Sequence, residues 1–309
     1  MNERSIDVEP RLDADATLEI RDGMRVAARL SLWWTRTPAL AGERVGFFGD
    51  YACADARAAQ PLLDAACRRL RAAGCTLAIG PVDGSTWTRY RFITQRGGRA
   101  RFLLEPDNPD AYPLQVQAAG FRPFAAYFSA VEMPADESDA RTQRAAARIR
   151  ASGVTIRPFH PACFERELDA MYDVAGAAFA SSLLFAPLER AAFHALYAPL
   201  REQIDPDFVR IAEHDGRAVG FAFGIVDRTA LERGAPLDTL VGKTQARLPE
   251  RHYAGLGAAL LDDVRRRARE RGLRQIIHAL IRDDNVARAT SRRSATVFRR
   301  YALFARNVA

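Results

Sequence analysis

The sequence contains almost no lysine. Of its 45 basic residues, all but Lys243 are arginine, so arginine supplies nearly all of the positive charge in a chain of net charge +7. A composition rich in Ala and Arg indicates a biased genome. No aromatic-interleaved basic motif or zinc-finger spacing accompanies the charge, so nucleic-acid binding is not predicted. The arginine clusters are either solvated surfaces or attract an acidic partner.

Long apolar runs and paired cysteines are also missing. No apolar run approaches the ~20 residues that a membrane span requires, and the polar start Met1–Ser5 does not fit a signal peptide. The cysteines Cys53, Cys67, Cys75 and Cys163 show no C-x-x-C spacing. These absences predict a cytoplasmic protein with reduced cysteines, no structural metal and no membrane partner.

What the sequence does contain is a strand, a glycine turn, a helix and a strand. Residues 240–248 alternate between an apolar and a polar face, as in a strand with one polar side. From 256 to 268, apolar residues recur every fourth position, which predicts an amphipathic helix, and 276–281 reads as a buried strand. Gly255-x-Gly257 opens the helix, where free backbone N–H groups and the helix dipole favour a phosphate.

This segment resembles the GCN5-related N-acetyltransferase (GNAT) superfamily. There, a loop of the form Arg/Gln-x-x-Gly-x-Gly/Ala cradles the coenzyme A pyrophosphate. Pro249-Glu250 and Gly255-x-Gly257 match the approach and the second half of that loop, and Asn285 falls where a later helix begins. His252 replaces the usual Arg or Gln, Tyr253 replaces the first glycine, and no tyrosine lies seven or eight residues after Asn285.

The resemblance implies a cofactor site for acetyl-CoA or another acyl-CoA, used as a co-substrate. It implies that Arg247 and its neighbours hold the pantetheine and that 255–258 hold the pyrophosphate. The implied cofactor-binding residues are Arg247, His252, Tyr253, Ala254, Gly255, Leu256, Gly257, Ala258 and Asn285. His252 has a second interpretation, as a residue that simply caps the loop.

Three residues are candidates for catalysis, each with an open alternative. Lys243 offers a compact ammonium whose pKa can fall on burial, a property that arginine lacks, or it is a chance survivor on a polar strand face. His278 is a general base or a hydrogen-bonded core histidine. Tyr301 donates a proton to the leaving thiolate or is a packed core tyrosine. Gln245 is expected to face the acceptor, and Trp87 and Tyr90 either line an acceptor pocket between domains or anchor their loop.

A repeat indicates two similar domains. Residues 62–79 align without gaps on 260–277 at a constant offset of 198, with eight identical pairs. Where the second copy has Gly255 and Gly257, the first has Arg57 and Ala59, so the first copy is expected to have lost the phosphate turn. In addition, Gly-Pro-x-x-Gly-Ser-Thr-Trp at 80–87 is similar to tandem acetyltransferase-like bacterial proteins.

We therefore expect an α/β protein (α+β mixed sheet) of two GNAT-like domains in tandem, the N-terminal copy degenerate. The predicted limits are 1–133, a linker over 134–152, and 153–309, the last with the order β-α-α-β-β-β-α-β-α-β. The favoured function is transfer of an acyl group from acyl-CoA to the amine of a small molecule or amino acid, bound near the domain interface. Two alternatives stand: an acyl carrier protein as donor, and a non-catalytic acyl-CoA sensor.

Overall fold

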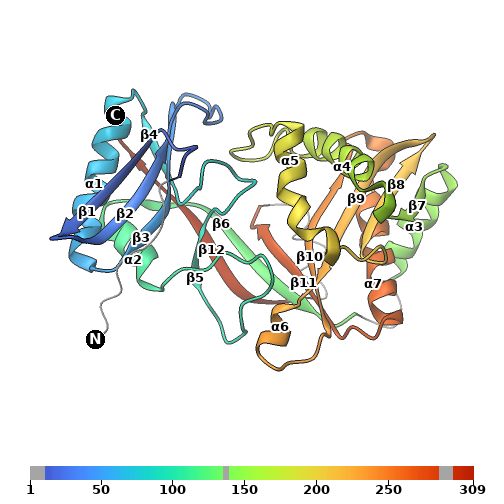
Figure 1. Cartoon of the computed structure of the whole chain (residues 1–309). Helices are drawn as coiled ribbons and strands as arrows, with labels where there is room; N and C mark the ends of the chain where they lie inside the picture. The colour runs from blue at the N-terminus through green and yellow to red at the C-terminus, as the bar shows by residue number, and fades with distance from the viewer. Residues whose placement is uncertain (1–10, 135–138, 285–294) are drawn as a thin grey trace.

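The computed structural model describes residues 11–134, 139–284 and 295–309. Within these residues, twelve strands form one mixed sheet in the order β1-β2-β3-β4-β12-β6-β11-β10-β9-β8-β7, and β5 pairs with β12 off this path. Figure 1 shows two lobes, each with helices packed on its part of the sheet, joined through β6 and β12. The predicted mixed α/β fold with two similar halves is confirmed.

The elements lie close to their predicted positions. The strands are β1 (Ala16–Asp22), β2 (Arg25–Trp33), β3 (Val45–Cys53), β4 (Leu77–Gly80), β5 (Phe92–Gln95), β6 (Arg122–Glu132), β7 (Thr155–Pro158), β8 (Val209–His214), β9 (Arg217–Val226), β10 (Thr239–Arg247), β11 (Gln275–Arg282) and β12 (Thr296–Asn307). The helices are α1 (Ala56–Ala72), α2 (Ala111–Ala118), α3 (Ala140–Ala151), α4 (Phe164–Phe179), α5 (Arg190–Tyr197), α6 (Thr229–Glu232) and α7 (Leu256–Glu270). β1 pairs antiparallel with β2 at the outer edge of the sheet, and α5 is followed directly by a 3₁₀ turn, Ala198–Gln203.

The repeat has a structural counterpart in each lobe. In the N-terminal lobe, β3, α1 and β4 form a parallel β-α-β unit in which Val45 pairs with Leu77. In the C-terminal lobe, β10, α7 and β11 do the same, and Thr239 pairs with Gln275. Since Leu77 and Gln275 are 198 residues apart, the offset seen in the sequence places both crossover helices and the following strands in equivalent positions.

The two crossover helices begin differently. The side chain of Asp55 caps α1 by accepting a hydrogen bond from the Arg57 N–H, so the first helix start carries a carboxylate. Gly255 occupies the N-cap of α7 with φ of +97°, and no side chain caps that helix. A capping carboxylate repels a phosphate, whereas uncapped amides attract one. The first copy is degenerate as predicted.

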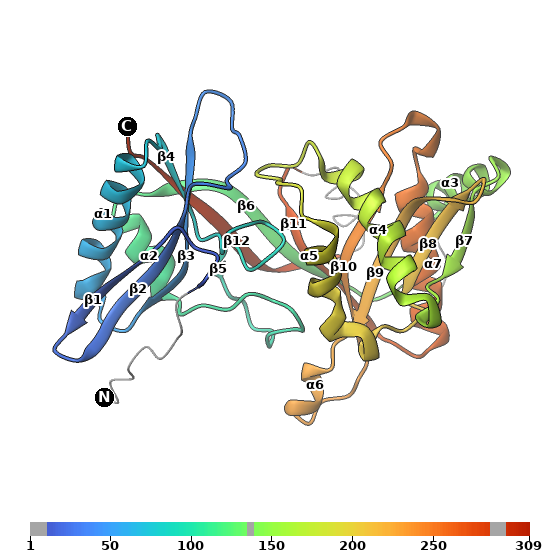
Figure 2. The same ribbon diagram turned by 45° about the horizontal axis from the view of Figure 1, so that its top comes forward.

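The lobes exchange their final strands. β6, the last strand of the N-terminal half, pairs with β11 of the other lobe, while β12 pairs with β4 and β5 of the N-terminal lobe. β6 and β12 also pair with each other along nearly their whole length. In Figure 2 the two strands cross together from one lobe to the other. The predicted domain limits remain a prediction, but neither lobe's part of the sheet is made from one continuous stretch of chain.

Helices cover both faces of the C-terminal sheet. α7 and α4 both pack on β9 and β10, and the core gathers apolar residues from these helices and strands. Leu240 and Val241 are both fully buried, because each face of β10 carries a helix. α3 lies in the stretch predicted as a linker and packs along α7. A segment between the lobes therefore forms part of the wall around the glycine turn.

Candidate functional site

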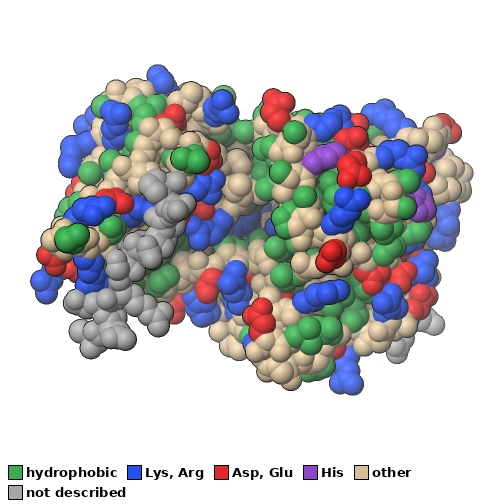
Figure 3. Space-filling model, viewed as in Figure 1, with side chains coloured by type: hydrophobic (Ala, Val, Ile, Leu, Met, Phe, Trp, Pro, Cys, Tyr) green, Lys and Arg blue, Asp and Glu red, His purple; other side chains and the backbone are tan. Residues whose placement is uncertain are grey.

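A cleft of about 1900 Å³ opens between the two lobes and runs along α3 and α7. Figure 3 shows the molecule hollowed between its halves, with blue side chains in and around the hollow. Of the residues that the structure describes, eleven arginines or lysines line the cleft, against four aspartates or glutamates. The positive charge of the protein is therefore concentrated where a negatively charged ligand would enter.

The floor of the cleft forms where two parallel strands part. β10 and β11 are paired from Thr239 with Gln275 to Gly242 with His278, and no pairing follows. The pairing of β10 with β9 shifts register between Gly242 and Thr244, which places a β-bulge at Lys243. Bulges redirect side chains and are frequent beside active sites. The backbone of β10 beyond Gly242 is therefore open to the cleft on its β11 side.

Lys243 lies where β10 and β11 part, and its electrostatic environment is unusual. Its side chain is partly buried and lines the cleft, and within the described part of the chain its ammonium has no hydrogen-bond or ion-pair partner. Burial, with a smaller contribution from the positive charge of Arg91, lowers the pKa of Lys243 to about 8. The only lysine of the sequence thus carries a substantial neutral fraction near physiological pH.

The glycine turn lies at the other end of the open strand. Gln245 donates a hydrogen bond to the Gly257 carbonyl, which ties the turn to β10. From α3, Arg148 Nη2 donates to the Ala254 carbonyl at 2.6 Å. A Cβ on Gly255 would lie 2.7 Å from that same Nη2 atom, so only glycine leaves room for the guanidinium. Gln245 therefore holds the turn and also lines the cleft, and its expected contact with the acceptor stays a prediction.

Several residues of the predicted loop anchor it on the side away from the cleft. The Tyr253 hydroxyl lies 3.1 Å from His214 Nδ1 at the end of β8, and the ring centroids of His252 and Tyr253 are 3.9 Å apart. Leu256 is fully buried in the core. His252, Tyr253 and Leu256 do not line the cleft. The loop residues that do are Ala254, Gly255, Gly257 and Ala258, together with Arg247 on β10. Arg247 donates to the Leu248 carbonyl at 2.8 Å.

His278 belongs to a buried charged cluster at the lobe junction. Its Nε2 lies 3.2 Å from Glu132 Oε2 of β6, and Arg265 of α7 forms two bonds of 2.6 Å to the same carboxylate. Burial alone would raise the pKa of Glu132, but bonds from His278 and Arg265 outweigh it and hold that pKa well below its usual range. His278 lines the cleft and is oriented by the Glu132 carboxylate.

Replacing Glu132 by glutamine is expected to destabilise the fold by about 3 kcal/mol, because it removes the buried carboxylate charge that pairs with Arg265 and His278. A carboxylate with a lowered native pKa stabilises the protein above its unfolded pKa, and this contribution is lost as the pH falls. The unfolding free energy of the wild type should therefore decrease more steeply below about pH 4.5 than that of the variant. Urea titrations at pH 7 and pH 4 measure both effects.

Glu270→Gln is the matched control for this experiment. Glu270 is on the same helix as Arg265 but is exposed, and its ion pair with Arg266 is solvated. Its loss should change stability by less than about 0.5 kcal/mol. If Glu132→Gln and Glu270→Gln lowered the free energy of unfolding equally, the buried cluster would stabilise the fold no more than an exposed ion pair does.

The N-terminal lobe brings an aromatic loop to the cleft. Trp87 donates from Nε1 to the Ala186 carbonyl at 2.9 Å and packs against Phe179 and Phe193, so it docks this loop on α4 and α5. Both Trp87 and Tyr90 also line the cleft. Trp87 therefore anchors its loop, and a contact of Trp87 or Tyr90 with the acceptor stays a prediction.

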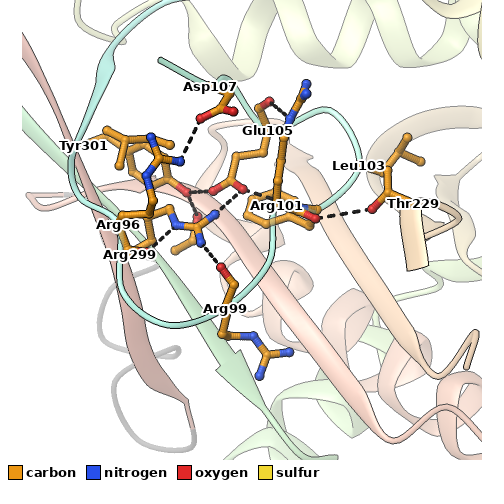
Figure 4. A network of polar contacts seen from close by, with 12 residues as sticks. Arg96, Arg99, Arg101, Leu103, Glu105, Asp107, Thr229, Arg299 and Tyr301 are labelled. Carbon is orange, nitrogen blue, oxygen red and sulfur yellow. Dashed lines mark hydrogen bonds and ion pairs between the residues drawn. The ribbon is translucent and has the colours of Figure 1, made fainter. Parts of the chain in front are cut away.

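Tyr301 lies away from these groups. It is 1% exposed in β12, does not line the cleft, and donates to Glu105 while its oxygen is 3.0 Å from Ser129 Oγ. Figure 4 shows Arg299 bound to the same Glu105 carboxylate. Burial raises the pKa of Tyr301. The structure favours the interpretation as a core tyrosine, and we assign Tyr301 no part in the chemistry; Asn285 lies outside the described residues.

The sequence analysis missed several groups of this site. Arg91, Tyr127 and Glu132 reach the cleft from the N-terminal half, and Arg148 comes from the helix before the second unit. Tyr197, at the end of α5, also lines the cleft; burial raises its pKa to about 12 although Thr244 of β10 hydrogen-bonds to it. Each of these residues stands outside any recognisable sequence motif, so the neighbouring residues give no indication that it belongs to the site.

The turn and its surroundings fit a diphosphate. The first amides of α7 have no side-chain cap, and Arg144 and Arg148 of α3 line the cleft beside them. In the described ranges, no group of three or more His, Cys, Asp or Glu residues is arranged to hold a metal ion. Across those same residues, no helix has the length and apolar character of a membrane span.

Comparisons with known proteins identify the fold. No protein-family model matches the sequence, and no curated protein matches it. Among solved structures, the GCN5-related glucosamine N-acetyltransferase region of a fungal multi-domain GH3 β-N-acetylglucosaminidase is similar over 92% of this chain, with a TM-score of 0.55 and 13% identity. That match spans only 32% of the fungal chain.

Two bacterial structures are similar to the same extent. A GCN5-related N-acetyltransferase from Sphaerobacter thermophilus matches 93% of this chain and 78% of its own, with a TM-score of 0.51 and 17% identity. A probable N-acyltransferase from Enterococcus faecalis V583 matches 94% of this chain and 62% of its own, with a TM-score of 0.54 and 11% identity. The likeness covers both lobes of the molecule.

Proposed function

We propose that this protein, a chain with the GCN5-related N-acetyltransferase fold in two copies, transfers an acyl group from acyl-CoA to the amine of a small acceptor. The observation that carries the proposal is the parting of β10 and β11 at Gly242 and His278. It exposes strand backbone to a cleft that has an uncapped glycine turn at one end and a lysine of lowered pKa at the other. These are the parts that direct acyl transfer requires.

The turn end of the cleft would hold the diphosphate. The α7 amides after Gly255 supply donors at a helix N-terminus, and Arg148 adds a guanidinium that is already fixed to the Ala254 carbonyl. Arg144, one helical turn earlier on α3, faces the same cleft. Beyond the turn, the unpaired edge of β10 would bind the pantetheine arm through backbone hydrogen bonds.

The other end would perform the transfer. Acyl-CoA, when bound, supplies a thioester carbonyl that an amine can attack, with formation of the C–N bond and loss of the thiolate. Neutral Lys243 would accept the proton that the attacking amine releases. The carboxylate of Glu132 orients His278 beside the last paired position of β11, where its ring is available as a second proton acceptor. The cleft walls orient the two substrates for direct attack.

Calorimetric titration of acetyl-CoA tests the cofactor site. Arg148→Glu is expected to weaken binding by about 100-fold, since it removes a donor to the diphosphate and adds a repelling charge, an effect of about 2.7 kcal/mol. Arg150→Glu is the matched control, because Arg150 is also exposed on α3 but does not line the cleft. Equal affinities for wild type, Arg148→Glu and Arg150→Glu would contradict the proposed location of the diphosphate.

The second candidate function is acyl transfer from an acyl carrier protein in place of acyl-CoA. The exposed residues Arg141 and Arg144 of α3 and the cleft-lining Arg269 of α7 form a basic rim at the cofactor end of the cleft. Such a rim attracts an acidic protein and makes its binding sensitive to salt. Activity with an acyl carrier protein but not with acyl-CoA, declining with ionic strength, would favour this candidate. Binding of acyl-CoA without turnover over a broad panel of amines would instead favour a sensor.

A further inference from the structure

The cleft contains a buried arginine that lacks a counter-charge. Among the described residues, four arginines are at most 4% exposed. Arg29 pairs with Asp50 at 2.8 Å, Arg210 with Asp263 at 2.6 Å, and Arg299 with Glu105. Arg91 is the fourth, and no described carboxylate lies within ion-pair distance of it. Burying an unpaired guanidinium is costly, and in the described part of the chain Arg91 is the one arginine buried to this extent without an ion pair.

The guanidinium of Arg91 is held in a fixed position. Its central carbon lies 3.6 Å from the centroid of the Tyr90 ring and 4.1 Å from that of Tyr127. Nη1 donates to the Leu280 carbonyl at 2.9 Å, while Nε is buried without a hydrogen-bond partner. The backbones of Arg91 and Leu280 both have positive φ, of 73° and 58°. Such strain in non-glycine residues is typical of functional sites.

Arg91 faces the end of the cleft where the amine would react. It lines the cleft, and its bond to Leu280 places it two residues beyond His278 on β11. Its positive charge also contributes to the lowered pKa of Lys243. The diphosphate end, at α7, has arginines of its own on α3. A ligand group bound to Arg91 therefore belongs to the acceptor and not to the coenzyme.

We propose that Arg91 binds a carboxylate of the acceptor, so that the substrate is an amino acid or another amine that carries a carboxylate. This inference rests on the proposed acyltransferase function and narrows its substrate class. An arginine held by one carbonyl keeps its remaining donors for a planar, two-oxygen partner, which is the geometry of a carboxylate. With the carboxylate on Arg91, the amine of the substrate lies toward Lys243.

Matched pairs of acceptors test this proposal. The kcat/KM values of wild type and Arg91→Gln are measured with the common amino acids and with the amines that result from removing their α-carboxyl groups, with acetyl-CoA as donor. For the best pair, the wild type is expected to prefer the amino acid on the order of 100-fold. Arg91→Gln should lose most of that preference, because activity on the amino acid falls much more than activity on the decarboxylated amine. The smaller loss on the amine reflects the contribution of Arg91 to the lowered pKa of Lys243.

Two further variants separate recognition from folding. Arg91→Lys keeps the charge but not the two-donor geometry and should lie between wild type and Arg91→Gln. Arg89→Gln removes a neighbouring charge of the cleft that is exposed and paired with Asp83, and should leave the preference unchanged. Thermal unfolding of all variants shows which of them fold. A wild type that uses the decarboxylated amines equally well would overturn the inference, as would equal losses on both acceptors in Arg91→Gln.

A binding readout keeps the inference distinct from the proposed reaction. If no acceptor is acylated, the proposed function fails, and thermal-shift measurements with the same amino acids and amines decide the role of Arg91. Stabilisation of the wild type that requires the carboxylate, is weaker in Arg91→Lys and is lost in Arg91→Gln would support the carboxylate site. Absence of carboxylate-dependent stabilisation in the wild type would overturn it.

Discussion

Replacing Lys243 by methionine is expected to lower kcat by about 10²- to 10⁴-fold, the usual contribution of a general base. The pKa of about 8 sets the pH dependence of the wild type. Only the neutral amine accepts a proton, and about a tenth of the Lys243 side chains are neutral at pH 7. Activity should therefore rise with pH and level off above pH 8. The methionine variant should show no such rise with pH.

Lys243→Arg is the informative control, because a guanidinium keeps the charge but does not lose its proton in this pH range. If Lys243 served only to attract anions, the arginine variant would retain most of the activity, and the proposed base would be wrong. The absence of other lysines allows a direct measurement of the pKa. After reductive methylation with a ¹³C label, the single side-chain signal reports the titration by NMR without mutagenesis.

Gly255→Glu is expected to weaken acyl-CoA binding by more than about 100-fold, or 2.7 kcal/mol. The backbone φ of +97° disfavours any side chain, and the new Cβ would lie 2.7 Å from Arg148 Nη2. The guanidinium would have to move away from the turn, and the added carboxylate would repel the diphosphate. Calorimetric titration of acetyl-CoA measures the loss.

Two controls separate the causes of that loss. Gly255→Ala introduces the strain and the contact with Arg148 without a charge, and should weaken binding less than Gly255→Glu. Gly98→Glu adds the same charge on an exposed loop with no atom within 4 Å of the new Cβ, and should bind acetyl-CoA normally. If Gly255→Glu bound as tightly as Gly98→Glu, the turn would not be part of the cofactor site.

The fold was predictable from the sequence where it depends on local patterns. The glycine turn, the amphipathic helix after it and the flanking strands follow from residue spacing, and the constant offset of 198 revealed the second copy. The degenerate start of the first copy was predictable as well, because Arg57 stands where the other copy has Gly255. The substitutions at His252 and Tyr253, which departed from the family pattern, place both residues against His214 and away from the cleft.

The site was less predictable, because its parts come from distant segments. Arg91 and Glu132 reach the cleft only through the pairing of β6 with β11 and the docking of the Trp87 loop. Tyr301 has the strand pattern expected of a closing strand, but β12 closes the opposite lobe, and its hydroxyl meets Glu105. Residue spacing specifies that a strand is buried but not which lobe it joins.

The strand exchange also limits the order in which the molecule is completed during synthesis. β4 pairs with β3 and is complete at residue 80, but its second sheet neighbour is β12, which begins at residue 296. The edge of β4 therefore stays unpaired on the ribosome until nearly the whole second lobe has emerged. Exposed strand edges are sites of misassociation, so this edge is open to wrong pairing while the second lobe is being synthesised. For the same reason, a gene fragment that encodes residues 11–134 alone would yield a sheet that ends at β4, with β5 and β6 lacking the strands they pair with.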